Sequence, residues 1–229
     1  MASLQMRVIR GVLRLTRKPR TATVERARTR IAAPKGSNEP PAALRSRHDV
    51  RTRRVQGFPC TTVAPRGGGS GRAVVYLHGG SYTGEIAPQH WALISKLADA
   101  GVRVEVPLYG LAPQHTYREA YPFVTAVYRE LLAQVDASAV TIAGDSAGGG
   151  LALGFAQTLA AEGLPQPRRL VLLSPWLDLT LSHPDLPALE PRDPWLNIDG
   201  TREAGVVDRK SGSAGMPRPK RISRMPSSA

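Results

Sequence analysis

The sequence is poor in the residues that mark several common protein classes. It has one cysteine, Cys60, so an intramolecular disulfide and a small disulfide-stabilised scaffold are excluded. No apolar run approaches the ~20 residues that a membrane-spanning helix needs. The first ten residues lack the uninterrupted apolar core of a signal peptide, and no histidine and cysteine spacing indicates a metal site. We therefore expect a cytoplasmic protein that uses neither a metal nor a cofactor.

Acidic residues are scarce only at the two ends of the chain, whose formal net charge is +13. Residues 1–54 carry 15 Lys and Arg against three acids, residues 206–229 carry six against one, and residues 55–205 are mildly acidic. A nucleic-acid enzyme carries positive charge on its working surface, often interleaved with aromatic residues. Since the middle of this chain is acidic, we do not expect a nucleic-acid partner.

The N-terminal residues 5–18 have the spacing of an amphipathic helix. Four apolar residues fall on one face and four arginines on another: Leu4, Val8, Val12 and Leu15 against Arg7, Arg10, Arg14 and Arg17. Such a helix either packs its apolar stripe on the domain or associates weakly with an anionic membrane surface. We favour packing on the domain, because Gly11 weakens the helix and the apolar face lacks aromatic anchors.

Between the basic ends, short apolar runs alternate with helical spacings. We expect strands at 73–77, 102–108, 139–143 and 170–173, helices at 88–100, 117–135 and 147–162, and an edge strand near 59–63. The alternation predicts βαβ units and an α/β fold, in which helices cover both faces of a mainly parallel sheet. The expected regions are a basic N-terminal cap or arm at 1–54, an α/β domain at 55–205 and a disordered basic tail at 206–229.

The motif G-x-S-x-G occurs at residues 144–148, between an expected strand and an expected helix. That setting is typical of a nucleophile elbow, in which Ser146 stands exposed on a tight turn. Gly144 and Gly148 let the backbone pass closely, while Asp145 and Ala147 flank the serine. The alternative is a glycine-rich helix start without chemistry. We favour Ser146 as a nucleophile, with the helix N-terminus near the developing oxyanion.

A second glycine motif follows the strand at 73–77 directly. His78 is followed by Gly79 and Gly80, whose backbone N–H groups could approach a substrate carbonyl oxygen. With the N–H of Ala147 they would form an oxyanion hole. We interpret His78 as a structural histidine rather than a general base, because it belongs to a segment that supplies backbone donors.

Four blocks now support a specific resemblance: YLHGGSY at 76–82, YGLAPQH at 109–115, GDSAGGG at 144–150 and LSPWLDLT at 173–180. In this order they resemble the hormone-sensitive-lipase-like family of α/β-hydrolases, which comprises bacterial carboxylesterases and lipases. The resemblance covers residues 45–205 and implies an ester substrate, a Ser146 nucleophile and an N-terminal helical cap. Two departures are Ser81, where the family has a third glycine, and Gln114, where it usually has glutamate.

The family's catalytic aspartate and histidine, which follow the serine, have no counterpart here. Four of the five histidines precede Ser146, and no strand follows His183 to place it. Whether His183 acts as a substitute base stays open. Asp193 and Asp199 resemble the family's cap-side loop instead. We therefore expect an α/β-hydrolase domain that is incomplete on its C-terminal side, with the strand at 170–173 left as an exposed edge.

One hypothesis is that a frameshift near codon 205 replaced the original C-terminal part, which the nucleotide sequence of the gene would decide. Loss of the triad base typically lowers the rate by on the order of 10⁴–10⁶. The leading prediction is thus an ester hydrolase for short acyl esters with very low activity. The alternatives are a non-catalytic remnant of the fold and, least favoured, a module whose basic ends bind anionic surfaces.

Overall fold

The computed structural model describes residues 3–210 and folds around a six-stranded mixed sheet. The strand order is β1-β2-β4-β3-β5-β6, in which β4, β3, β5 and β6 run parallel while β1 and β2 pair antiparallel. This is the α/β class that the alternation of apolar runs and helices predicted. The strands are β1 (Asp49–Val55), β2 (Phe58–Ala64), β3 (Ala73–Leu77), β4 (Arg103–Pro107), β5 (Val140–Asp145) and β6 (Arg169–Leu173).

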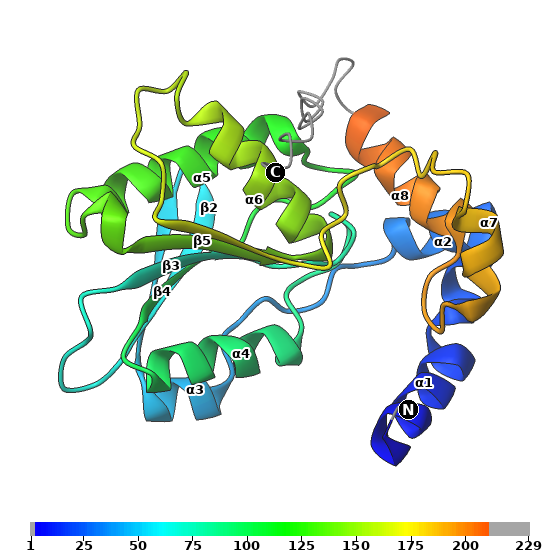
Figure 1. Cartoon of the computed structure of the whole chain (residues 1–229), viewed down its shortest axis with the longest axis horizontal. Coiled ribbons are helices and arrows are strands. Elements are labelled where there is room, and N and C mark those ends of the chain that lie inside the picture. The colour runs from blue at the N-terminus through cyan, green and yellow to red at the C-terminus, as the bar shows by residue number, and fades with distance from the viewer. Residues whose placement is uncertain (1–2, 211–229) are drawn as a thin grey trace, which may run out of the picture.

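Helices cover both faces of this sheet, with α3 and α4 on one side and α5 and α6 on the other (Figure 1). Their bounds are α3 (Ala42–Arg47), α4 (Pro88–Asp99), α5 (Tyr117–Leu132) and α6 (Ser146–Thr158). All five residues of the central strand β3 are buried. Val74 and Tyr76 join the core under α4, while Val75 and Leu77 join the core under α5 and α6. Alternate side chains of one strand thus serve both layers.

The edge of the sheet on the β1 side differs from the prediction. β2 is an interior strand between β1 and β4, and the edge strand is β1, which begins at Asp49. The expected boundary between residues 54 and 55 therefore falls inside a strand. The sequence DVRTRRV of β1 does not read as a strand, because four of its residues are charged and most are exposed. Charges of this kind are typical of edge strands and discourage pairing with other chains.

The opposite edge is formed by β6, as predicted. Within residues 3–210 it pairs with β5 alone. Its apolar side chains Leu170, Val171 and Leu173 are 38–44% exposed, although a strand of this composition is normally buried. This apolar edge is an aggregation hazard in the described part of the chain.

A group of helices at one end of the sheet forms what we call the cap (Figure 1). It consists of α1 (Leu4–Thr16), α2 (Val24–Ala32), α7 (Leu186–Leu189) and α8 (Ile198–Lys210). α2 packs against α8, and Arg28 of α2 forms an ion pair with Glu203 of α8 at 2.8 Å. Residues from both ends of the described chain therefore build one cap. None of the described helices is both long and apolar enough to cross a bilayer.

Two expectations about the cap were wrong. The apolar stripe of the first helix does not pack on the domain, because no residue of α1 is buried. The tail expected to be disordered from residue 206 begins as helix, since α8 continues to Lys210. The remaining part of that prediction, residues 211–229, lies outside the described residues.

A fully buried carboxylate links an interior strand of the sheet to arginine side chains, one of them on the charged edge strand. Glu105 of β4 has no exposed surface and accepts hydrogen bonds from Arg53 (2.9 Å) and Arg103 (2.7 Å). Thr62 donates a third, at 2.9 Å. The neighbouring thiol of Cys60 has its pKa raised by burial and by Glu105, so it stays protonated. These contacts satisfy a charge that would otherwise be costly to bury.

We expect Glu105→Gln to lower the free energy of unfolding by about 3–5 kcal/mol, because it leaves two arginines facing a neutral partner. The matched control is Glu130→Gln, which removes the half-exposed partner of Arg53 and should cost at most about 1 kcal/mol. Chemical denaturation of both variants measures the difference. Equal losses would contradict the role assigned to the buried carboxylate.

Candidate active site

Ser146 stands on the turn between β5 and α6. Its φ is +50°, a left-handed conformation that is uncommon for serine and marks a strained backbone. Glycine is needed at 144 and 148 because neighbouring backbone atoms approach too closely for a side chain, and not because of a positive φ. A Cβ on Gly148 would overlap the carbonyl oxygen of Leu77, and one on Gly144 would lie 2.8 Å from the same oxygen. The strand–turn–helix geometry predicted for Ser146 is therefore present, with the serine partly exposed.

The turn is held from two sides. The backbone N–H of Trp176, in the segment after β6, donates to the carbonyl oxygen of Ser146 at 2.7 Å. The hydroxyl of Tyr82 donates to the carbonyl oxygen of Ala147 at 2.8 Å and its ring stacks on Trp176. Ala147 is buried in the first turn of α6, where backbone N–H groups have no acceptor within the helix. Its N–H is thus without an acceptor inside the helix and lies next to Ser146 in the chain.

The loop after β3 corrects one of the predicted oxyanion donors. The N–H of Gly79 donates to the Asp145 carboxylate (Oδ1) at 2.9 Å, so it is not free for a substrate. In the described residues the N–H groups of Gly80 and Ser81 have no acceptor. Both residues have positive φ, +135° and +57°, and Gly80 tolerates this because it lacks a Cβ. Gly80, Ser81 and Ala147 therefore carry the available amides.

Asp145 connects the elbow to that loop. Besides Gly79, its carboxylate accepts hydrogen bonds from the hydroxyl of Tyr76 (2.8 Å) and from Nε2 of His90 (3.2 Å). His90 Nδ1 accepts the N–H of Ala87, which leaves the proton on Nε2 facing Asp145. Burial alone would raise the pKa of Asp145. The bonds from His90, Tyr76 and Gly79 outweigh it and hold that pKa below its ordinary value.

His78 has the structural role predicted for it. It is fully buried, its ring stacks on Tyr109 at 4.6 Å, and Nδ1 lies 2.8 Å from the carbonyl oxygen of Gly79. Burial lowers the pKa of His78 to about 4, so the imidazole is neutral. A neutral ring committed to the loop backbone shapes the loop after β3 and is not placed to take a proton from Ser146.

None of the five histidines bonds to the hydroxyl of Ser146. His78 and His90 are engaged as described, and His48 bonds to Ser95. His115 lies 3.8 Å from Glu119. His183 accepts the N–H of Asp185 at 3.3 Å and is 66% exposed. Ser146 therefore stands on a tight strand-to-helix turn, and within residues 3–210 no imidazole is hydrogen-bonded to it.

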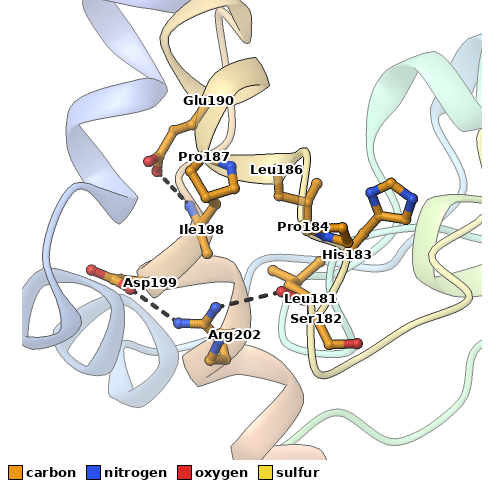
Figure 2. Close-up of a pocket in the computed structure, with 10 residues that line it drawn as sticks. All are labelled: Leu181, Ser182, His183, Pro184, Leu186, Pro187, Glu190, Ile198, Asp199 and Arg202. Atoms are coloured by element: carbon orange, nitrogen blue, oxygen red, sulfur yellow. Dashed lines mark hydrogen bonds and ion pairs between the residues drawn. The ribbon is translucent and has the colours of Figure 1, made fainter.

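A cavity of about 480 Å³ in the cap contains His183 in its lining but not Ser146 (Figure 2). On one side of this cavity Arg202 contacts Asp199 at 3.3 Å and the carbonyl oxygen of Leu181 at 3.5 Å. Figure 2 shows the His183 ring on the side away from Arg202. Within residues 3–210, no group of three or more His, Cys, Asp or Glu side chains is arranged to hold a metal ion.

A family model described as an alpha/beta hydrolase fold matches residues 74–205, which include the loop after β3 and the Ser146 elbow. This chain belongs to the α/β-hydrolase family. As an α/β-hydrolase it is 28% identical to a solved esterase of the bacterial hormone-sensitive lipase family. The TM-score is 0.65, over 85% of this chain and 70% of that one. The hormone-sensitive-lipase-like assignment made from the four sequence blocks is confirmed.

Curated relatives of this α/β-hydrolase carry names of ester-cleaving enzymes. It is 43% identical over 111 residues to an acetyl-hydrolase of Streptomyces hygroscopicus, which covers 48% of this chain and 37% of that protein. It is 34% identical over 135 residues to an esterase of Acinetobacter venetianus, which covers 58% of this chain and 44% of that protein. The chain thus spans less than half the length of these two relatives.

Sequence reasoning missed three participants in the site. His90 lies in the first turn of α4, and only the folded chain brings it to Asp145, 55 positions later. Tyr76 could have been suspected, because a polar side chain in an apolar strand usually needs a partner. The amide of Ser81 was missed because the third position of the family's glycine run is not glycine here.

We expect Asp145→Asn to lower the free energy of unfolding by about 1.5–3 kcal/mol, since it weakens three hydrogen bonds to a charged acceptor. The control Asp185→Asn changes an exposed carboxylate in the cap and should leave the denaturation midpoint unchanged. Loss of equal size in both variants would mean that Asp145 does not brace the loop.

The same interaction predicts a pH dependence. Because the folded pKa of Asp145 lies below its ordinary value of 3.8, its contribution to stability is present above that value. It is lost as the pH falls through the lower folded pKa. The stability difference between the parent chain and Asp145→Asn should therefore be constant from pH 5 to 7 and shrink below about pH 4. A difference that grows on acidification would contradict this account.

Proposed function

We propose that this chain carries the nucleophile and the oxyanion donors of a carboxylic ester hydrolase, with Ser146 as the nucleophile. The observation that supports the proposal most is the combination of a left-handed φ at Ser146 with unpaired amides beside it. Backbone strain at a partly exposed serine on a strand-to-helix turn is costly, and strain of this kind is concentrated at functional sites. The relatives named acetyl-hydrolase and esterase support an ester as the substrate.

In the proposed reaction Ser146 Oγ attacks the acyl carbon and the carbonyl oxygen becomes an oxyanion. The N–H groups of Gly80, Ser81 and Ala147 stabilise that charge. The alcohol then leaves, and water releases the acyl group from the serine. The attack needs a base for the serine proton, and within residues 3–210 no imidazole bonds to Ser146. We therefore propose that the chain alone turns over esters at a rate near background.

Short acyl esters are the proposed substrate class. Ser146 is the first residue of α6, a helical cap stands at one end of the sheet (Figure 1), and Tyr82 and Trp176, which both contact the backbone of the turn, form an aromatic pair. Ligand sites of this kind are small and mostly apolar. The name acetyl-hydrolase of the Streptomyces relative supports a short acyl group.

A second candidate is a module that keeps the fold without catalysis. The observation that favours it is the engagement of all five histidines away from Ser146. The two candidates differ in whether the serine hydroxyl can form a covalent bond, so the decisive experiment is one that reports bond formation rather than turnover.

We expect hydrolysis of p-nitrophenyl acetate by the full chain to be indistinguishable from that of the Ser146→Ala variant. Without a base the serine hydroxyl stays protonated near neutral pH. Initial rates at pH 7 and at several protein concentrations measure this. Protein-dependent turnover that Ser146→Ala abolishes would refute the impaired activity while supporting the nucleophile.

We expect a phosphonyl fluoride to label Ser146 slowly, because the reagent forms a tetrahedral adduct whose oxygen the free amides can bind. Peptide mass spectrometry after prolonged exposure at pH 9 locates the label. Ser146→Ala should abolish labelling. The matched control Ser174→Ala, at another serine with left-handed φ (+45°), should retain it. Intact protein labelled elsewhere, or not at all, would favour the module without catalysis.

A further inference from the structure

The helix α1 contacts the rest of the cap through its polar side. The guanidinium groups of Arg10 and Arg14 donate to the carbonyl oxygens of Arg192 and Pro191. Just after the helix, the ammonium group of Lys18 donates to the carbonyl oxygens of Glu190 (2.6 Å) and Asp193 (2.7 Å). A helix of a globular protein normally turns its apolar stripe inward and its charges outward. In α1 this orientation is reversed.

The apolar side of α1 consequently faces solvent. The exposed fractions are 75% for Leu4, 59% for Val8, 50% for Ile9, 53% for Val12 and 81% for Leu15. Figure 1 shows α1 extending away from the sheet, beyond the other cap helices. A contiguous apolar stripe on an exposed helix marks an interaction surface rather than ordinary surface composition. No described residue covers this stripe, and a helix of 13 residues is marginal alone in water.

The charge around the stripe identifies what can cover it. Residues 1–24 contain six Lys and Arg and no acidic residue. At 100° per residue, Arg7 lies next to Leu4 at the border of the apolar stripe, whereas Arg17 follows the helix and lies on the opposite side. Neither has a side-chain hydrogen bond or ion pair within residues 3–210. A second copy of residues 1–24 would bring six further positive charges to this surface. An anionic lipid surface supplies both an apolar layer and negative headgroups.

We propose that α1 is an interfacial helix that docks the chain on an anionic lipid bilayer. It lies in the plane of the headgroups, with Leu4, Val8, Val12 and Leu15 in the acyl boundary and Arg7 at the phosphates. Arg10 and Arg14 tie the docked helix to the cap. Lipid docking needs no turnover at Ser146, so its test and the tests of ester hydrolysis succeed or fail separately.

The test is flotation of the full chain with vesicles of phosphatidylcholine alone or with 30% phosphatidylserine. We expect binding to the anionic vesicles, little binding to the neutral ones, and a decrease as salt is raised from 50 to 300 mM. Absence of binding to the anionic vesicles at 50 mM salt would overturn the proposal.

Substitutions show whether vesicle binding depends on α1 or on exposed apolar side chains elsewhere. Val12→Ser with Leu15→Ser should lower the partition coefficient on the order of a hundredfold. Its matched control, Leu177→Ser with Leu189→Ser, removes two leucines that are 48% and 51% exposed elsewhere and should bind like the parent chain. Arg7→Gln should weaken binding and reduce its salt dependence.

The serine variants of α1 should fold as the parent chain does, which a thermal melt of each variant checks. None of the four apolar positions on α1 is buried, so the thermal midpoint should not change. Equal vesicle binding by the Val12→Ser, Leu15→Ser variant would overturn lipid docking. So would a concentration-dependent dimer of the parent chain that this variant loses, because the stripe would then be covered by a second copy.

Discussion

The hydrogen bond between the Asp145 carboxylate and the N–H of Gly79 joins the two halves of the proposed site. One half is the turn at the end of β5, and the other is the loop at the end of β3. The strands are neighbours in the sheet, so their carboxyl ends meet at the same edge. Glycine at 148 allows α6 to start against the backbone of Leu77. The Asp145 bond is charge-assisted, and the hydrogen bond from Tyr82 to the carbonyl oxygen of Ala147 joins the same two segments.

This bond also explains why one predicted donor was wrong. Counting residues after the strand identifies a glycine pair but does not say which N–H points at a substrate. The carboxylate of Asp145 occupies the first amide, and this moves the available donors to Gly80 and Ser81. His90 and Tyr76 then complete the shell around that carboxylate. A partly buried carboxylate with three donors is held ionised and in place, which suits a group that orients its neighbours.

Much of the α/β domain could be predicted because its signals are local. The apolar runs of β3 and β5 and the glycine motifs that follow them report strands and tight turns directly. The edge strand β1 could not be predicted, because an arginine-rich sequence forms a strand here only through its partner β2 and the buried Glu105. The position of α1 depends on carbonyl groups near residue 191, far along the chain. No periodicity within residues 5–18 encodes which face of the helix would meet them.

The helix α1 and the proposed site around Ser146 are connected through the cap. Segments from both ends of the described chain build the cap, and Trp176 links the segment leading to it with the backbone of Ser146. A chain docked through α1 would hold the cap at a lipid surface, while the sheet lies away from α1 (Figure 1). The catalytic proposal does not depend on that arrangement, since it rests on Ser146 and the three amides.

The most direct measurement of the central claim is a crystal structure of the chain after reaction with a phosphonyl fluoride. The account predicts continuous density from Ser146 Oγ to phosphorus, with the phosphoryl oxygen within hydrogen-bonding distance of the Gly80, Ser81 and Ala147 amides. Density at another residue, or an adduct oxygen turned away from these amides, would contradict it.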